Sequence, residues 1–274
     1  MSQDSSLDLP IILDAALQFG TRTARVRLRG ATGPLLNHDE IQRRWGPFIR
    51  RTPVEDDEDI VLDLISQEGP WPRPDQPPRV SLTASRRGGA CLVLRDDIHV
   101  TLNRAAAMME GHIAPRLPAV EECLRMLLWL QLTQDERSPG LMIHSASTVH
   151  QDRAVCFPAY GGTGKSTLAS LTPGELALSD EISLLTREAD GWVVWPCPFW
   201  NWPRQSQAPE ISPWPLEALA FCCRTSLGWQ HVSNVPLKKL AQGHFSGLQQ
   251  SQHPLSNPSL FTNSPFDSSL FRVK

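Results

Sequence analysis

The sequence lacks a strong excess of charge of either sign. Its 26 lysines and arginines and 29 aspartates and glutamates leave a formal net charge of −3 at pH 7. No basic stripe occurs in any segment, which argues against nucleic acid as the main partner. Long apolar runs are also missing, since the most apolar helix candidate, residues 123–132, contains Arg125 and is too short to span a bilayer. The N-terminus lacks the basic and apolar segments of a secretory signal, so we expect a cytoplasmic protein with no membrane partner.

The cysteines lack the paired spacings of a disulfide framework or a zinc site. Most of the six lie within apolar segments, and the single adjacent pair is unfavourable as an intrachain bridge. We therefore expect buried, reduced thiols, as is usual in a cytoplasmic protein. The six positions are Cys91, Cys123, Cys156, Cys197, Cys222 and Cys223.

The most specific motif that is present is a glycine-rich segment. An apolar strand candidate, residues 154–157, precedes it, and a helix-compatible run, residues 165–171, follows it. This order of strand, loop and helix is that of a phosphate-binding loop, so the segment predicts nucleotide binding. The predicted nucleotide-binding residues are Ala159, Tyr160, Gly161, Gly162, Thr163, Gly164, Lys165, Ser166 and Thr167.

Each residue type in this loop has a chemical role. Glycines allow sharp backbone turns and a close approach of backbone N–H groups to phosphates. We expect Lys165 to neutralise the β- and γ-phosphates, Ser166 to ligate Mg²⁺ through its hydroxyl, and Thr167 to reach the α-phosphate. The loop departs from the usual pattern at its first position, where Ala159 replaces glycine. The expected cofactors are ATP and Mg²⁺.

An acidic pair follows the loop after a short interval. Apolar residues 176–178 lead through Ser179 to Asp180 and Glu181, which predicts a strand that delivers two carboxylates to its C-terminal end. Carboxylates there can bind Mg²⁺ and act on a reacting hydroxyl. The interval from Lys165 holds one short helix and a turn, whereas the metal-binding acid of transporter ATPases and motor proteins comes much later. The transporter signature Leu-Ser-Gly-Gly is absent. The simpler alternative for the pair is a solvated strand end or a helix cap.

A histidine-bearing strand candidate, residues 141–149, precedes the loop and forms a hairpin with the strand that enters it. The order His-Ser-Ala-Ser, Gly-Gly-Thr-Gly-Lys-Ser-Thr and Ser-Asp-Glu within residues 141–186 resembles the HPr serine kinase/phosphatase family. That family shares its nucleotide fold with ATP-dependent phosphoenolpyruvate carboxykinase. In it, a histidine before the loop contacts an acid after it, and the acid acts on the attacking hydroxyl or water. The resemblance implies these roles for His144 and Asp180, with Glu181 where the family usually has a second aspartate.

The motif and the resemblance together predict a P-loop kinase that transfers the γ-phosphoryl group of ATP to a hydroxyl. The expected acceptor is a serine of a peptide or protein, or a hydroxyl of a small metabolite. Asp180 is expected to accept the hydroxyl proton, with His144 orienting it and Lys165 balancing the phosphate charge. Ser166, Asp180 and Glu181 are the expected metal ligands.

Two alternatives stay open. The first is a nucleotide-dependent binding module or switch with weak or no catalysis, which Ala159, Glu181 and the lack of the family's C-terminal signature would fit. The second is a carboxykinase, for which no further substrate or metal motif is visible. His144 and Asp180 favour the kinase, because nucleotide binding alone needs neither. The sequence does not name the acceptor and allows a homo-oligomer.

We expect an α/β (α+β) architecture in three parts. Residues 1–118 form a small α+β module, residues 119–243 a P-loop kinase domain of the HPr kinase/phosphoenolpyruvate carboxykinase type, and residues 244–274 a loosely ordered tail. A helix at residues 119–134 is expected to pack on the nucleotide-domain sheet, and a second helix is expected at residues 215–223. Further strands are expected at residues 21–28, 79–84, 90–94, 98–102, 182–185 and 192–195.

A segment rich in tryptophan and proline, residues 196–204, follows the last of these strands. Trp200 and Trp202 could wall a substrate pocket or simply pack a rigid loop. Arg187 and Arg204 are candidates for stabilising the transferring phosphoryl group, although arginines on loops are usually solvated.

Overall fold

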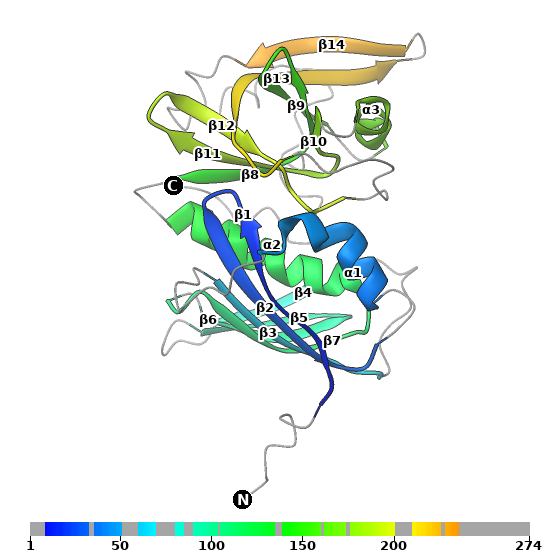
Figure 1. Ribbon diagram of the computed structural model, residues 1–274, viewed down its shortest axis with the longest axis vertical. Coiled ribbons are helices and arrows are strands. Elements are labelled where there is room, and N and C mark those ends of the chain that lie inside the picture. The colour runs from blue at the N-terminus through cyan, green and yellow to red at the C-terminus, as the bar shows by residue number, and fades with distance from the viewer. Residues whose placement is uncertain are drawn as a thin grey trace, which may run out of the picture. The chain divides into compact units, whose positions relative to one another are not determined.

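A computed structural model of the chain has a mixed α/β fold with two sheets and few helices (Figure 1). Two compact units, Met1–Glu136 and Arg137–Lys274, make up the chain and are described separately. No helix in the part of the chain that the structure describes is long and apolar enough to cross a membrane. The structure describes residues 9–32, 36–50, 60–69, 80–84, 90–103, 105–134, 139–159, 162–173, 176–200, 210–225 and 228–235.

A seven-stranded sheet forms the centre of the first unit. Its order is β1-β2-β3-β7-β6-β5-β4, in which β3 is parallel to β2 and β7 and all other neighbours are antiparallel. Burial alternates along β3, because Ile60, Leu62 and Leu64 are fully buried whereas Asp63 reaches solvent. The strands are β1 Ile11–Phe19, β2 Arg22–Gly30, β3 Ile60–Ser66, β4 Val80–Ala84, β5 Ala90–Arg95, β6 Ile98–Asn103 and β7 Met108–Ile113.

Helix α1, His38–Trp45, has the local signals of a surface helix and is followed by a short 3-10 helix, η2, Gly46–Phe48. Asn37 caps α1, since its side-chain oxygen accepts a hydrogen bond from the backbone N–H of Glu40 at 2.9 Å. The helix buries Ile41 and Trp45, so its apolar side belongs to the core of the first unit.

Helix α2, Leu117–Gln134, confirms the helix expected at residues 119–134 but not its packing. It packs on β3 and β7 of the first sheet, with Val120, Leu124 and Leu127 among its buried residues. The expected contact with the nucleotide-domain sheet stays a prediction. The apolar face of a helix indicates that this face is buried against another element, but it does not indicate which sheet buries it. The boundary between the two units accordingly falls after α2 rather than at residue 118.

Five strands of the second unit close into a barrel. β8 pairs with β11, β11 with β12, β12 with β13, β13 with β9, and β9 returns to β8. All of these pairs are antiparallel except β9 with β13, while β10 pairs with β8 and β14 with β13 outside the ring. The elements are β8 Gly140–His150, β9 Arg153–Pro158, α3 Lys165–Leu171, β10 Ala177–Ser179, β11 Ile182–Glu188, β12 Gly191–Trp195, β13 Trp214–Thr225 and β14 Gly228–Val235.

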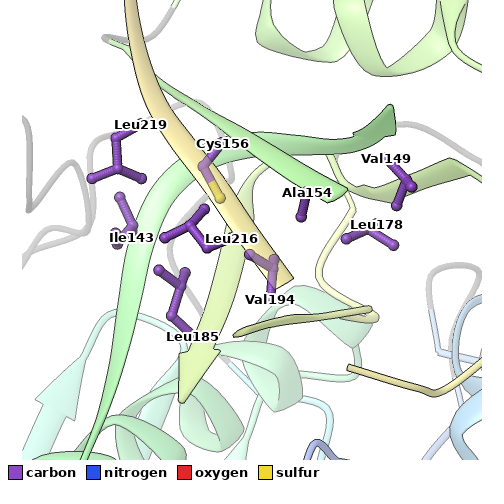
Figure 2. Close-up of a cluster of buried hydrophobic side chains, with 9 residues drawn as sticks. All are labelled: Ile143, Val149, Ala154, Cys156, Leu178, Leu185, Val194, Leu216 and Leu219. Carbon is purple, nitrogen blue, oxygen red and sulfur yellow. The ribbon is translucent and has the colours of Figure 1, made fainter. Parts of the chain in front are cut away.

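Side chains from all five barrel strands and from β10 fill the barrel interior (Figure 2). Eight strands make a barrel just wide enough for side chains to fill, so five strands enclose a packed core rather than a ligand cavity. A functional site in this unit must therefore lie on the outside of the barrel. The interior residues are Ile143, Val149, Ala154, Cys156, Leu178, Leu185, Val194, Leu216 and Leu219.

The second unit differs from expectation in one predicted helix and in the closure of its sheet. The helix expected at residues 215–223 is wrong, because this segment is strand β13, which pairs with β9, β12 and β14. The mixed α/β class is confirmed, but a closed five-stranded barrel is not typical of a P-loop kinase domain. The expected tail, residues 244–274, lies outside the described residues.

Candidate functional site

The glycine-rich loop leaves β9 and enters α3. Ala159, the first loop residue, is buried, while Tyr160 and Gly161 lie outside the described residues. Gly162 and Gly164 have φ angles of 75° and 95°, in the left-handed region that favours glycine. A Cβ at Gly162 would meet no atom within 4 Å, so the backbone conformation rather than crowding selects glycine there.

Lys165 is the first residue of α3 and is only 6% exposed. Its Nζ donates a hydrogen bond to the carbonyl oxygen of Ala159 at 2.8 Å, which ties the two ends of the loop together. Burial lowers the pKa of the Lys165 ammonium, and the carboxylates of Glu181 and then Asp180 oppose this shift. Ser166 is half-buried and Thr167 is exposed.

The acidic pair lies between β10 and β11, at the position that the sequence predicts. Asp180 is 1% exposed and Glu181 is half-buried. Both act electrostatically on Lys165, and Glu181 acts more strongly than Asp180. The structure thus brings the loop lysine and the two carboxylates together.

The donor set suits a phosphate-bound divalent cation better than a metal held by protein alone. Hard cations such as Mg²⁺ take oxygen ligands, and they commonly use one or two carboxylates together with phosphate oxygens. Asp180 and Glu181 supply two carboxylates near the loop, and Ser166 supplies a hydroxyl. Within the described ranges, no group of three or more His, Cys, Asp or Glu side chains is placed to hold a metal ion. Two carboxylates and a hydroxyl are donors of the kind that Mg²⁺ accepts.

Strand β8 holds the loop and the acidic pair in register. On one side Ser145 faces Pro158, the last residue of β9. On the other side the backbone N–H of Ser145 donates to the carbonyl of Glu181 at 3.0 Å. His144, which is half-buried, stands opposite Ile182 and next to Ser145. The expected hairpin is confirmed, and the contact of His144 with Asp180 stays a prediction.

Four buried serines beside the acidic pair were not singled out by sequence reasoning. Their hydroxyl oxygens lie 2.6 to 2.9 Å apart in a chain that runs from β8 to β10 and β11. The alternation of His-Ser-Ala-Ser places two serines on one face of β8, which is the signal that could have indicated them. Burial raises the pKa of the neighbouring Cys156 thiol to about 12, with hydroxyls of the cluster opposing the shift. The serines are Ser145, Ser147, Ser179 and Ser183.

Trp200 packs the outside of the barrel rather than walling a pocket. It is 9% exposed, and its Nε1 donates to the carbonyl of Cys197 at 2.7 Å. It forms a buried cluster with Ala146 of β8, Ala169 of α3 and Ala177 of β10. Packing is therefore the correct alternative for this residue. Trp202 lies outside the described residues.

The arginine candidates are not brought to the site in the described part of the chain. Arg187 is exposed near the end of β11, five residues beyond Ile182, or roughly 16 Å along the strand. Arg204 lies outside the described residues.

Free thiols occur at four cysteines in the ranges that the structure describes, and three of these are buried. This agrees with the expectation of reduced cysteines for Cys91, Cys123, Cys156 and Cys197. The side chains of Cys222 and Cys223 lie outside the description.

Comparison with known proteins gives no assignment, since no protein-family model and no curated protein matches the chain. The geometry of the site must carry the functional argument.

Proposed function

We propose that this chain is an ATP-dependent kinase that transfers the γ-phosphoryl group to a hydroxyl of a peptide, a protein or a small metabolite in the cytoplasm. The observation that carries the proposal is a glycine-rich loop with left-handed glycines that leads into a buried lysine, Lys165, with Asp180 and Glu181 near enough to act electrostatically on its ammonium. Burying an ionisable side chain costs free energy unless it is paired. Lys165 is buried, and its ammonium is hydrogen-bonded to the Ala159 carbonyl and interacts with the two carboxylates, so a positive charge is held at the loop where a bound anion would lie.

The loop is suited to a polyphosphate. Positive φ angles at Gly162 and Gly164 turn the backbone where N–H groups would face the phosphates. The Lys165 ammonium donates to the Ala159 carbonyl. When a nucleotide binds, it would donate to the β- and γ-phosphate oxygens instead. That exchange replaces a neutral acceptor by a charged one, which strengthens the hydrogen bond.

The acidic pair is suited to the metal and to the acceptor. When bound with the nucleotide, Mg²⁺ would neutralise charge on the transferring phosphoryl group. Glu181, the half-buried member, and the Ser166 hydroxyl would supply oxygen ligands. Asp180 would accept or hold the proton of the attacking hydroxyl, a role that contributes about 10²–10⁴-fold elsewhere. His144, placed opposite Ile182 on β8, would orient this acid.

The test of this proposal measures binding and transfer separately. Calorimetric titration gives the affinity for ATP with and without Mg²⁺, and γ-labelled ATP with serine-containing peptides reports transfer. Matched peptides with alanine in place of serine show whether the hydroxyl is the acceptor. Asp190→Asn, at an exposed turn between β11 and β12, is the control variant.

We expect Mg²⁺-dependent ATP binding and label on the serine peptides, both unchanged in the control variant. Absence of ATP binding in the presence of Mg²⁺ would refute the proposal. Binding without transfer to any hydroxyl would favour the alternative of a nucleotide-dependent binding module. Transfer to the enolate oxygen that a β-keto acid leaves when it loses CO2 would favour a carboxykinase.

A further inference from the structure

The serine cluster, Ser145, Ser147, Ser179 and Ser183, has no exposed surface on any of its residues. Its hydroxyl oxygens form one continuous chain. Ser147 lies 2.7 Å from Ser179, Ser179 lies 2.9 Å from Ser183, and Ser183 lies 2.6 Å from Ser145. The side chains that pack around it in the barrel interior are apolar or, at Cys156, a thiol. Hydroxyls in such surroundings cost free energy unless they are hydrogen-bonded, and these four are.

Two serines of the cluster lie on either side of the acidic pair in the sequence. Ser179 directly precedes Asp180, and Ser183 follows Glu181 by two residues. Both hydroxyl oxygens also lie within hydrogen-bond distance of the carbonyl oxygen of Ser145, at 3.4 and 3.3 Å, as an alternative acceptor for their single protons. The N–H of the same Ser145 donates to the carbonyl of Glu181. The backbone carbonyl and N–H of Ser145 on β8 therefore hold the chain before, within and after the acidic pair.

A shift in strand register explains how this arrangement orients Asp180. The pairing of β10 with β8 shifts between Ala177, opposite Thr148, and Ser179, opposite Ser147. Leu178 packs in the barrel interior and Ser179 bonds to serines there, so two consecutive side chains point to the same side. Such a bulge reverses the alternation beyond it. By this alternation we expect Asp180, the residue that follows β10, on the opposite side, where Ala177 packs with Ala169 of α3.

We infer that Ser179 and Ser183 are positioning residues that hold the bulge and thereby direct the Asp180 carboxylate to the loop side of the barrel. This inference rests on the proposed function. Neither hydroxyl needs to touch the nucleotide or the acceptor. Removing one leaves Asp180 chemically intact and frees the segment that carries it to adopt the ordinary strand alternation.

The test compares alanine variants of the cluster with a buried serine of the other unit. Ser183→Ala and Ser179→Ala remove the two hydroxyls that flank the acidic pair. Ser66→Ala is the matched control, because Ser66 is 1% exposed and its hydroxyl donates to the Ala31 carbonyl at 2.7 Å. Each variant is examined by chemical denaturation, Mg-ATP titration and transfer rate per folded molecule.

We expect all three variants to lose stability to a similar extent and to bind Mg-ATP within about threefold of the wild type. The transfer rate of the two cluster variants should fall tenfold or more, while that of Ser66→Ala should not change. The fall should be seen in kcat rather than in KM for Mg-ATP, because nucleotide binding depends on the loop. Ser183→Thr, which restores a hydroxyl, should recover part of the lost rate.

A double-mutant cycle separates positioning from general loosening. If Ser183 acts through Asp180, Ser183→Ala should have little effect on the residual rate of Asp180→Asn. Equal losses in both backgrounds would overturn the inference, and so would a full transfer rate in folded Ser183→Ala. If that variant does not fold, Ser147→Ala takes its place, with a smaller expected loss because Ser147 reaches the acidic segment only through Ser179. A wild type that neither binds nor turns over Mg-ATP removes the proposed function as well, so the two failures are distinguishable.

Discussion

Replacing Lys165 by methionine distinguishes the effect of the buried ammonium on the free energy of unfolding from its effect on nucleotide affinity. The Lys165 ammonium is 6% exposed and donates to the Ala159 carbonyl at 2.8 Å. A hydrogen bond from a charged group contributes about 1.5–3 kcal/mol. Desolvation of the ammonium opposes this gain, and methionine fills a similar volume without any charge. We therefore expect the free energy of unfolding of Lys165→Met to stay within about 1.5 kcal/mol of the wild type.

Nucleotide binding should respond very differently to the same change. Loss of one charge-assisted hydrogen bond to phosphate, about 1.5–3 kcal/mol, corresponds to a roughly 10- to 150-fold weaker affinity. Denaturation with and without Mg-ATP measures both effects in one experiment, because a ligand that binds only the native state stabilises it. A Lys165→Met protein that is severely destabilised without nucleotide but is still protected by Mg-ATP would refute this reasoning.

The pH dependence of stability gives an independent check of the same lysine. Burial holds the pKa of Lys165 below its ordinary value of 10.5. Between the lowered pKa and 10.5 the unfolded chain binds more protons than the native state, so the contribution of Lys165 to stability rises with pH. Lys165→Met should remove this rise. Phosphate raises the pKa of a bound ammonium, so ATP affinity should fall as pH increases through the pKa of the nucleotide-free state. Chemical denaturation and calorimetry across the alkaline range measure the two trends.

Three further substitutions test other parts of the structure. Asp180→Asn should bind Mg-ATP with near wild-type affinity and transfer phosphate at least about 100-fold more slowly, with Asp190→Asn as the control. An unchanged transfer rate would exclude Asp180 from the chemistry. Asp97→Asn, in the first unit, breaks buried ion pairs with two arginines and should lower the free energy of unfolding, measured with denaturant, by about 3–5 kcal/mol. A loss under about 1 kcal/mol would show that these pairs are solvent-screened. Trp200→Ala should cost about 3–5 kcal/mol and speed hydrogen exchange in α3, and unaltered exchange there would mean that the indole does not support the helix.

The sequence predicts the hairpin that carries the site because its signals are local. Strands β8 and β9 are short apolar segments joined by a polar turn. Within that turn Gln151 and Asp152 have positive φ angles of 49° and 59°. Such turns match the twist of the flanking strands. The motif interval also predicts the acidic pair beyond α3, since few residues separate Lys165 from Asp180.

The elements that the sequence misjudges depend on contacts between distant segments. The segment expected as a helix at residues 215–223 contains leucine, glutamate and alanine, which favour helix in isolation. It becomes strand β13 because β9, β12 and β14 satisfy its backbone hydrogen bonds and close the barrel. Propensity is a weak prior, and tertiary pairing overrides it here. The packing of α2 on β3 and β7 was not predicted for the same reason, because the apolar face of a helix does not identify the sheet that covers it.

Strand register connects packing to chemistry in the second unit. Along β8, Ile143 and Ser145 belong to the interior side, whereas Ala146 packs with α3 on the other side. Alternation puts His144 on the side of Ala146, which is the side of the loop helix. A slip of one residue would send His144 into the barrel core and a serine toward the loop. The choice between Asp180 and Glu181 depends on the same alternation, which the sequence alone leaves open, and the register shift in β10 is the observation from which we infer that Asp180 faces the loop. The hydroxyls that we infer to hold this register lie in the core, so the proposed chemistry outside the barrel would depend on hydrogen bonds inside it.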